Sequence, residues 1–147
     1  MGKLSVLKDD LEGMLASGDM EGIVSKAGHE RGVIRTLIGM TYDKQRASSW
    51  RAMDAIGRIT ANEKPEKVRN TLERLLWMMR EESGTNPWSA VEIVGEVLTR
   101  NHEPYKDIIP IVINFAEEPI MRAGSMRAMY RIGTVRPDLV REFACTG

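Results

Sequence analysis

Apolar residues recur along this chain at the three- and four-residue spacing of one helix face, and the clearest such stretch occurs three times. Residues 88–97 (WSAVEIVGEV) share their apolar skeleton and a glycine with residues 50–59 (WRAMDAIGRI) and 126–135 (MRAMYRIGTV). The glycine at the eighth position follows its predecessor after 38 residues both times, from 57 to 95 and from 95 to 133. A fixed period of this length is typical of stacked helical repeats. We therefore predict an all-α, right-handed solenoid of about nine helices.

The 38-residue period also divides the chain. We predict N-terminal capping helices over residues 1–28, repeats over 29–62, 63–102 and 103–136, and an incomplete last repeat over 137–147. In each complete repeat the glycine-bearing stretch forms the inner helix. We expect these inner helices near residues 46–60, 87–100 and 120–135.

Three shorter helices are predicted before the first inner helix, over Leu4–Ala16, Met20–Lys26 and Arg31–Tyr42. Ser17-Gly18-Asp19 should end the first of them and cap the second, and Ala27-Gly28 should end the second. Asp43 is a candidate N-cap for the inner helix that follows.

The second repeat begins with an outer helix whose apolar stripe runs from Val68 to Met79. Pro65 suits its first turn, and the helix should continue to about Glu82. Trp77 falls off the stripe, so we expect it either to be exposed or to contact another element. A tight turn over residues 81–87 should follow.

The outer helix of the third repeat is harder to assign. Tyr105–Glu117 is rich in β-branched residues, which alone would favour a strand. The repeat register aligns it with the earlier outer helices, so we predict a helix that Pro110 bends. Pro137 should open the next outer helix.

The recurring glycine carries a separate prediction. Glycine inside a helix costs about 1 kcal/mol relative to alanine, so its presence at one register in three copies needs a reason. Either the helix ends nearby or another backbone packs against the glycine.

Residues 121–133 (MRAGSMRAMYRIG) resemble the inner helix of HEAT-like repeats, in which an apolar residue and arginine precede a small residue, Ala-Leu and Ile-Gly. Residues 45–57 match this pattern nearly as well, whereas the middle copy has Ser83-Gly84 in place of the apolar-Arg pair. The period is slightly below the roughly 40 to 47 residues usual for HEAT and armadillo repeats. With Trp50-Arg51-Ala52 and residues 74–77 (RLLW), the sequence looks like that of a family of small bacterial HEAT-repeat proteins without assigned biochemistry. The resemblance covers most of residues 3–140 and implies the fold but no active site.

Charge and cysteine content narrow the function classes. Twenty-one basic and 21 acidic residues cancel, which removes the overall attraction to phosphate that non-specific nucleic-acid or membrane-surface binding uses. The longest apolar run, Ile108–Ile113, is far shorter than the ~20 residues of a membrane helix, and the acidic start does not resemble a signal peptide. The single cysteine, Cys145, favours a reducing, cytoplasmic compartment. No motif for a cofactor, a metal or a nucleophile appears, so we predict none of them.

The three inner helices, aligned by the period, form columns that predict a binding surface. Positions four apart share a helix face, so each copy sets a tryptophan or methionine beside a carboxylate or tyrosine. Aromatic residues and arginine dominate binding energy at protein interfaces. We therefore predict a non-catalytic module that binds a peptide or helix of another protein. The predicted partner-binding residues are Trp50, Arg51, Asp54, Arg58, Trp88, Glu92, Glu96, Arg127, Tyr130 and Arg131.

Three alternatives stay open. In the first, the tryptophans only fill space between neighbouring repeats. In the second, the chain binds or repairs DNA, because some HEAT-like solenoids are DNA glycosylases that use tryptophan, carboxylate and arginine; Glu92 and Glu96 would interrupt a phosphate track. In the third, His29-Glu30 and His102-Glu103 hold iron, as the His-Glu pairs of HEAT-type deoxyhypusine hydroxylases do. Here, however, both pairs precede outer helices.

The last predicted helix leaves an apolar edge. It carries Leu139, Val140 and Phe143, and no inner helix follows it. A solenoid end of this kind should be covered by self-association, by a partner, or by further chain such as relatives would carry.

Overall fold

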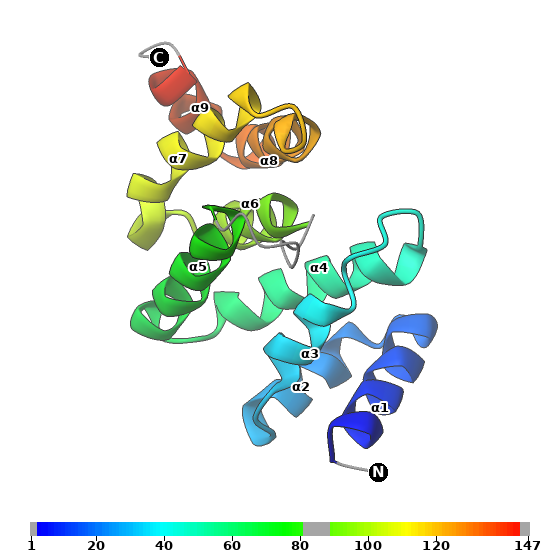
Figure 1. Cartoon of the computed structure of the whole chain (residues 1–147). Coiled ribbons are helices and arrows are strands. Elements are labelled where there is room, and N and C mark those ends of the chain that lie inside the picture. Colours follow the sequence, from blue (N-terminus) through cyan, green and yellow to red (C-terminus); the bar gives the residue numbers. More distant parts are fainter. Residues whose placement is uncertain (1–2, 81–88, 145–147) are drawn as a thin grey trace. The chain divides into compact units, whose positions relative to one another are not determined.

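The computed structural model describes residues 3–80 and 89–144, and these residues form nine α-helices and two short 3₁₀ helices (Figure 1). No strand occurs in this part of the chain, which confirms the all-α prediction. The chain divides into two compact units, Met1–Asn62 and Glu63–Gly147. In the described ranges no helix is both long and apolar enough to cross a membrane.

The N-terminal unit consists of α1 (Lys3–Ser17), α2 (Met20–His29), α3 (Val33–Gly39) and α4 (Ala47–Ala61). Its core is made by leucine, isoleucine and methionine side chains that recur at helical spacing on the four helices, because one stripe of each helix is apolar. The fully buried large side chains of this unit are Leu11, Leu15, Ile23, Leu37, Met53 and Ile56.

The connection between α1 and α2 follows the prediction. Gly18 adopts φ +76°, the left-handed conformation that glycine tolerates at a helix end. Asp19 is the N-cap of α2, and its carboxylate accepts a hydrogen bond from the Gly22 backbone N–H at 3.0 Å.

Other predicted boundaries in this unit are wrong. The helix predicted over Arg31–Tyr42 is α3, which runs only from Val33 to Gly39, because Gly32 takes a left-handed conformation before it. Ala27-Gly28 does not end α2, which continues to His29, and the chain reverses at Gly32 with φ +85°. Asp43 does not cap α4, because its carboxylate accepts a hydrogen bond from the Gln45 N–H at 3.1 Å, in a local turn before the helix begins. Aspartate forms such turns as readily as it caps helices, and the sequence pattern does not distinguish the two.

The C-terminal unit begins with α5 (Pro65–Arg80) and α6 (Ala90–Arg100). The predicted start at Pro65 is confirmed, and the predicted stripe is buried at Val68, Leu72, Leu75, Leu76 and Met79. Trp77 is 61% exposed, so it does not belong to this core. Trp88 and the predicted turn over residues 81–87 lie outside the described residues.

The third outer helix is not one bent helix. The segment forms a 3₁₀ helix η1 (Glu103–Ile108), the short α7 (Ile109–Asn114) and a 3₁₀ turn η2 (Phe115–Glu117). Pro110 lies in the first turn of α7, where its missing N–H removes no helical hydrogen bond. The proline therefore starts a new helix rather than bending an existing one, and the strand alternative is excluded.

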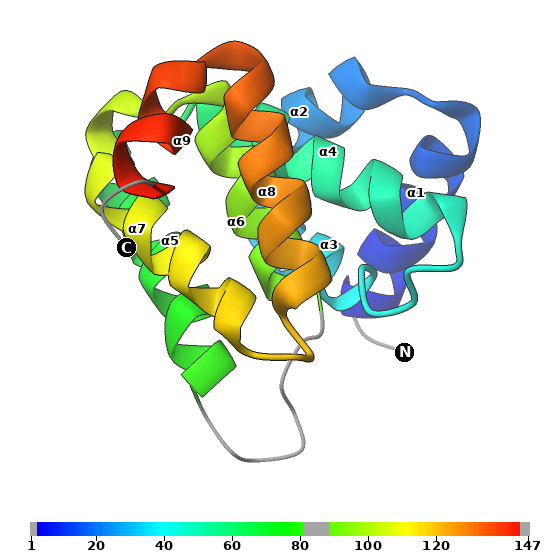
Figure 2. The ribbon, with the colours of Figure 1, turned by 90° about the horizontal axis from the view of Figure 1, so that it is seen from above.

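The unit ends with α8 (Arg122–Val135) and α9 (Pro137–Ala144), and the predicted start at Pro137 is confirmed. Figures 1 and 2 both show α8 running alongside α6. Every residue of α6 from Ala90 to Thr99 is buried. In this unit α6 is therefore the buried helix, and α8 packs along it.

Candidate functional site

The two helices approach most closely where α6 carries its recurring glycine. A Cβ atom on Gly95 would lie 2.6 Å from the Cβ and 2.9 Å from the Cα of Ala128 in α8. Real Cβ atoms do not come that near to a backbone atom, so only glycine fits this position. For Gly95 the predicted close approach of another backbone is confirmed.

A second close contact lies one turn earlier on α8. A Cβ on Gly124 would lie 2.6 Å from Oε1 of Glu92. Glu92 is 5% exposed, so its side chain occupies the space that the missing Cβ leaves. Two small residues of α8, four positions apart, thus receive α6.

The ion pairs of this interface centre on Glu96, which is 4% exposed. Arg131 donates from Nε and Nη2 to the two oxygens of Glu96 at 3.1 and 3.0 Å, which is the bidentate geometry of a strong pair. Nη2 of Arg127 lies 3.6 Å from Oε1 of the same carboxylate. Glu96 therefore links α6 to α8, and Glu92 and Glu96 are both buried and do not form a solvent-facing acidic patch.

The outward face of α8 is different. Met126 and Tyr130, one turn apart, are 58% and 65% exposed. Ala123, Arg127 and Thr134, on the same side of the helix, are also exposed. These five residues form what we call the outer α8 face.

Sequence register shows what the outer α8 face corresponds to in the preceding repeat. One period before Tyr130, Gly133 and Thr134 stand Glu92, Gly95 and Glu96. Those are the residues through which α6 receives α8. Two residues of the outer α8 face, Tyr130 and Thr134, thus stand one period after residues that are buried on α6.

Comparisons with protein-family models, with curated proteins and with solved structures found no match to this chain. No family is therefore shown for it.

The predicted site residues of α4 make contacts inside their own unit. Nε1 of Trp50 donates to the Lys44 carbonyl at 2.7 Å, and Arg51 donates to the carbonyls of Leu15 and Ala16 at the end of α1. Asp54 and Arg58 pair with each other along the helix, with 3.2 Å between Oδ2 and Nε. All four side chains therefore make hydrogen bonds or ion pairs within the N-terminal unit.

The two histidines also have protein partners. Nδ1 of His29 lies 2.7 Å from the Ser25 carbonyl oxygen, and Nε2 of His102 lies 3.0 Å from Nη1 of Arg136. Across residues 3–80 and 89–144, no group of three or more His, Cys, Asp or Glu side chains is placed to hold a metal ion.

Charged pairs also link neighbouring parts of the C-terminal unit. Arg69 of α5 makes a bidentate pair with Asp107 of η1, both distances being 2.9 Å, and this hydrogen bonding lowers the pKa of Asp107. Arg136 contacts Glu103 at 2.9 Å and Asp138 at 2.8 Å. The hydrogen bonds from Arg136 lower the pKa of Asp138 to about 2. These contacts fix the outer helices and present no reactive group.

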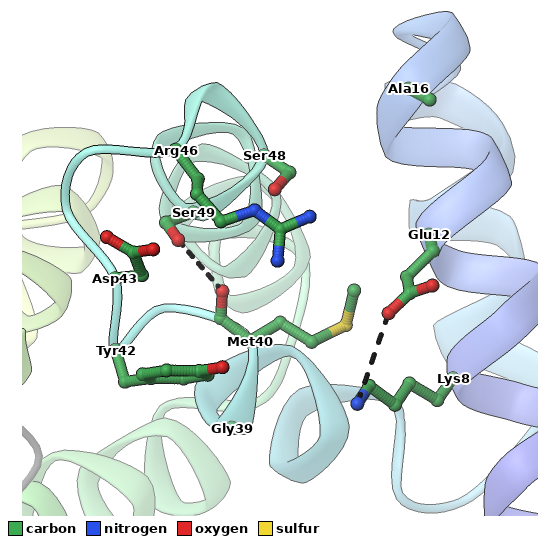
Figure 3. Close-up of a pocket in the computed structure, with 10 residues that line it drawn as sticks. All are labelled: Lys8, Glu12, Ala16, Gly39, Met40, Tyr42, Asp43, Arg46, Ser48 and Ser49. Carbon is green, nitrogen blue, oxygen red and sulfur yellow. Dashed lines mark hydrogen bonds and ion pairs between the residues drawn. The ribbon is translucent and has the colours of Figure 1, made fainter.

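A cavity of about 150 Å³ lies in the N-terminal unit between α1 and the start of α4 (Figure 3). Lys8 and Arg46 contribute positive charge to its wall, and Glu12 and Asp43 contribute negative charge. Ser49, the buried hydroxyl there, already donates to the Met40 carbonyl at 3.1 Å. The wall therefore favours neither an anion nor a cation.

Sequence reasoning missed the small residues that shape the α6–α8 contact. Gly124 and Ala128 are four positions apart, a spacing that places small side chains on one helix face and lets a second helix come close. This spacing in the sequence indicates a close helix contact. Gly133 indicates a similar position, because it stands one period after Gly95.

Proposed function

We propose that this chain is a HEAT-like α-solenoid that acts as a protein-interaction module, and that it binds a helix of a partner protein on the outer α8 face. The predicted family and the solenoid arrangement are part of this proposal. Of the predicted binding residues that the structure describes, Tyr130 is kept, since the others are buried or make contacts inside the protein, as Arg127 does with Glu96. Met126, which is exposed one turn before Tyr130, is added to it.

Repeated contacts at one register support the solenoid. Ser49 and Ser125 are two periods apart, both are buried, and each donates its hydroxyl to a carbonyl at or after the preceding outer helix, of Met40 and Val112 respectively. Arg69 and Asp107, one period apart, pair between successive outer helices. The two serines are equivalent by the period, although their acceptors are 72 and not 76 residues apart, and a serine that links inner and outer helices at one register is what stacked repeats produce.

The observation that carries the binding proposal is the exposure of Tyr130, whose equivalent in α6 is the buried Glu92, together with the exposure of Met126 one turn before it. These two large side chains expose apolar surface to water one turn apart, which is unfavourable unless a partner covers it. Tyrosine is also among the residues most enriched at binding hot spots. Methionine adapts its shape to different partners. A helix laid along this face would bury both side chains, in the helix-in-groove mode of recognition.

The proposal is tested by binding variants that leave the fold intact. Met126→Glu/Tyr130→Glu places two carboxylates on the outer α8 face, and exposed positions of this kind change stability by only about 0.5 kcal/mol. Trp77→Glu, which changes an exposed aromatic residue on α5, is the matched control. Affinity purification from the source cell should recover a stoichiometric partner with wild type and with the control, and lose it with the double variant. Recovery of the same partner by all three proteins would contradict the assignment.

A further inference from the structure

We infer that Met126 is a modification site: a peroxide oxidises its thioether to the sulfoxide, and the sulfoxide prevents the partner helix from docking on the outer α8 face. The effect on docking rests on the proposed function. The inference follows from the exposure of this one methionine, from its place on α8, and from the polarity of the oxidised side chain.

Met126 is the methionine that solvent reaches most easily. It is exposed, and no other methionine in residues 3–80 and 89–144 is. Met53 and Met79 are buried, and the remaining methionines of these ranges are half-buried. A peroxide has to contact the sulfur atom in order to oxidise it. Oxidation of the folded protein should therefore begin at Met126.

The reaction needs a peroxide as its only oxidant. A lone pair of the Met126 sulfur attacks one oxygen of hydrogen peroxide, so that an S–O bond forms while the O–O bond breaks. The sulfur is oxidised by one electron pair and the peroxide is reduced, because the departing hydroxide takes the proton of the transferred oxygen and leaves as water. Methionine sulfoxide reductases return the sulfoxide to methionine, with thiols as the source of the electrons.

The sulfoxide would stand in the middle of the proposed contact. Ala123 lies one turn before Met126 and Tyr130 one turn after it, and all three are exposed on the same side of α8. Oxidation turns a flexible apolar side chain into a polar one. A helix that covers the S–O group has to remove its water, which is unfavourable where the contact is otherwise apolar.

The same change should leave the fold intact. The closest contacts of α8 with α6 lie at Gly124 and Ala128, whereas Met126 is exposed between them in the sequence. Oxidation of a buried methionine would instead place a polar group in the core. An effect on binding without an effect on stability is therefore the signature of oxidation at Met126.

Peptide mapping by mass spectrometry tests the modification site with the full chain and hydrogen peroxide alone. At limiting peroxide, Met126 should be oxidised several-fold faster than Met129, which is half-buried on the same helix. A circular dichroism melt of protein oxidised only at Met126 should match that of untreated protein. Equal rates at the two methionines, or a lower melting temperature, would overturn the inference.

Affinity purification from the source cell tests the effect on docking, with the peroxide removed before the extract is added. Protein oxidised at Met126 should recover at least about ten-fold less partner than untreated protein, and treatment with a methionine sulfoxide reductase should restore the recovery. Met126→Leu has no sulfur at this position, so its own recovery of the partner should not change on peroxide treatment. Met129→Leu, the matched control, should be as sensitive to peroxide as wild type.

The outcomes separate this inference from the proposed function. If oxidised and untreated protein recover the same amount of a partner that depends on Met126 and Tyr130, or if Met126→Leu stays sensitive to peroxide, the inference is overturned and the proposed function stands. If untreated protein recovers no such partner, the proposed function fails, and the effect of oxidation on docking fails with it.

Discussion

Gly95 of α6 meets Ala128 of α8 at a distance that leaves no space for a Cβ atom. Around this contact are grouped Glu92, which fills the space beside Gly124, and Glu96, which binds Arg131. Close approach of two backbones lets the flanking side chains meet as well. The contact therefore constrains which residues α6 and α8 can carry at this point.

Alanine at the two equivalent glycines should have opposite effects on stability. Gly95→Ala should lower the free energy of unfolding by about 1–3 kcal/mol, because the added methyl overlaps Ala128 and the backbone has to move. Gly133→Ala should raise it by about 0.5–1 kcal/mol, because alanine favours the helix and the new Cβ meets only an ordinary contact. Urea unfolding of both variants measures these changes in the free energy of unfolding. Equal changes would contradict the difference in packing around Gly95 and Gly133.

Removal of the Glu96 carboxylate should destabilise the C-terminal unit. Glu96→Ala takes away two hydrogen bonds to Arg131 at a buried position, and we expect a loss of about 1–3 kcal/mol. Glu12→Gln, which breaks only the exposed Lys8–Glu12 pair in α1, should change stability by less than about 0.5 kcal/mol. A double-mutant cycle with Arg131→Gln separates the pair from its surroundings, and a coupling energy near zero would contradict the role given to it.

Ser125→Ala tests the contact between inner and outer helices. The Ser125 hydroxyl donates to the Val112 carbonyl at 2.6 Å in a buried position, so its loss should cost about 1–2 kcal/mol. Ser17→Ala removes an exposed hydroxyl hydrogen bond to the Met14 carbonyl and should have little effect. Thermal unfolding followed by circular dichroism compares the two, and an unchanged melting temperature for Ser125→Ala would argue against this link.

The pair between Arg136 and Asp138 makes stability depend on pH in acid. The native pKa of Asp138, about 2, lies below the value of an unfolded aspartate, near 4. Its stabilising contribution is therefore complete above about pH 4 and disappears as the pH falls from about 4 to 2. Asp138→Asn should flatten the decline of stability over this interval. High salt should narrow the difference between the two proteins, because the pair is exposed; identical acid denaturation curves at low salt would disprove the contribution.

Most helices could be predicted from the sequence, because each buries one apolar stripe. Val68 to Met79 in α5 shows this most clearly, and the stop and cap at Gly18 and Asp19 follow from local backbone preferences alone. Pro110 was harder. Proline excludes the middle of a helix but does not decide between a bend and a new start, which depends on how the chain on either side packs.

The sequence predicted only part of the candidate site. The period showed which residues of the three inner helices occupy one column, but not whether a column faces solvent or the next repeat. Glu92 and Glu96 look like surface residues by type, and only their contacts with Gly124 and Arg131 show that they lie between helices. The recurring glycine on the same side of the helix was the signal that this side receives a neighbour.

Site-specific photo-crosslinking from Tyr130 tests the central claim most directly. A photoreactive phenylalanine at position 130, introduced in the source cell, should give one crosslinked partner protein, with the crosslink mapped by mass spectrometry to a helical segment. The same probe at Trp77, an equally exposed position on α5, should not capture it. A partner crosslinked from position 130 and not from position 77 is the result we predict. Crosslinks from position 77 alone, or none from position 130 in cells where the protein is abundant, would contradict a binding surface on α8.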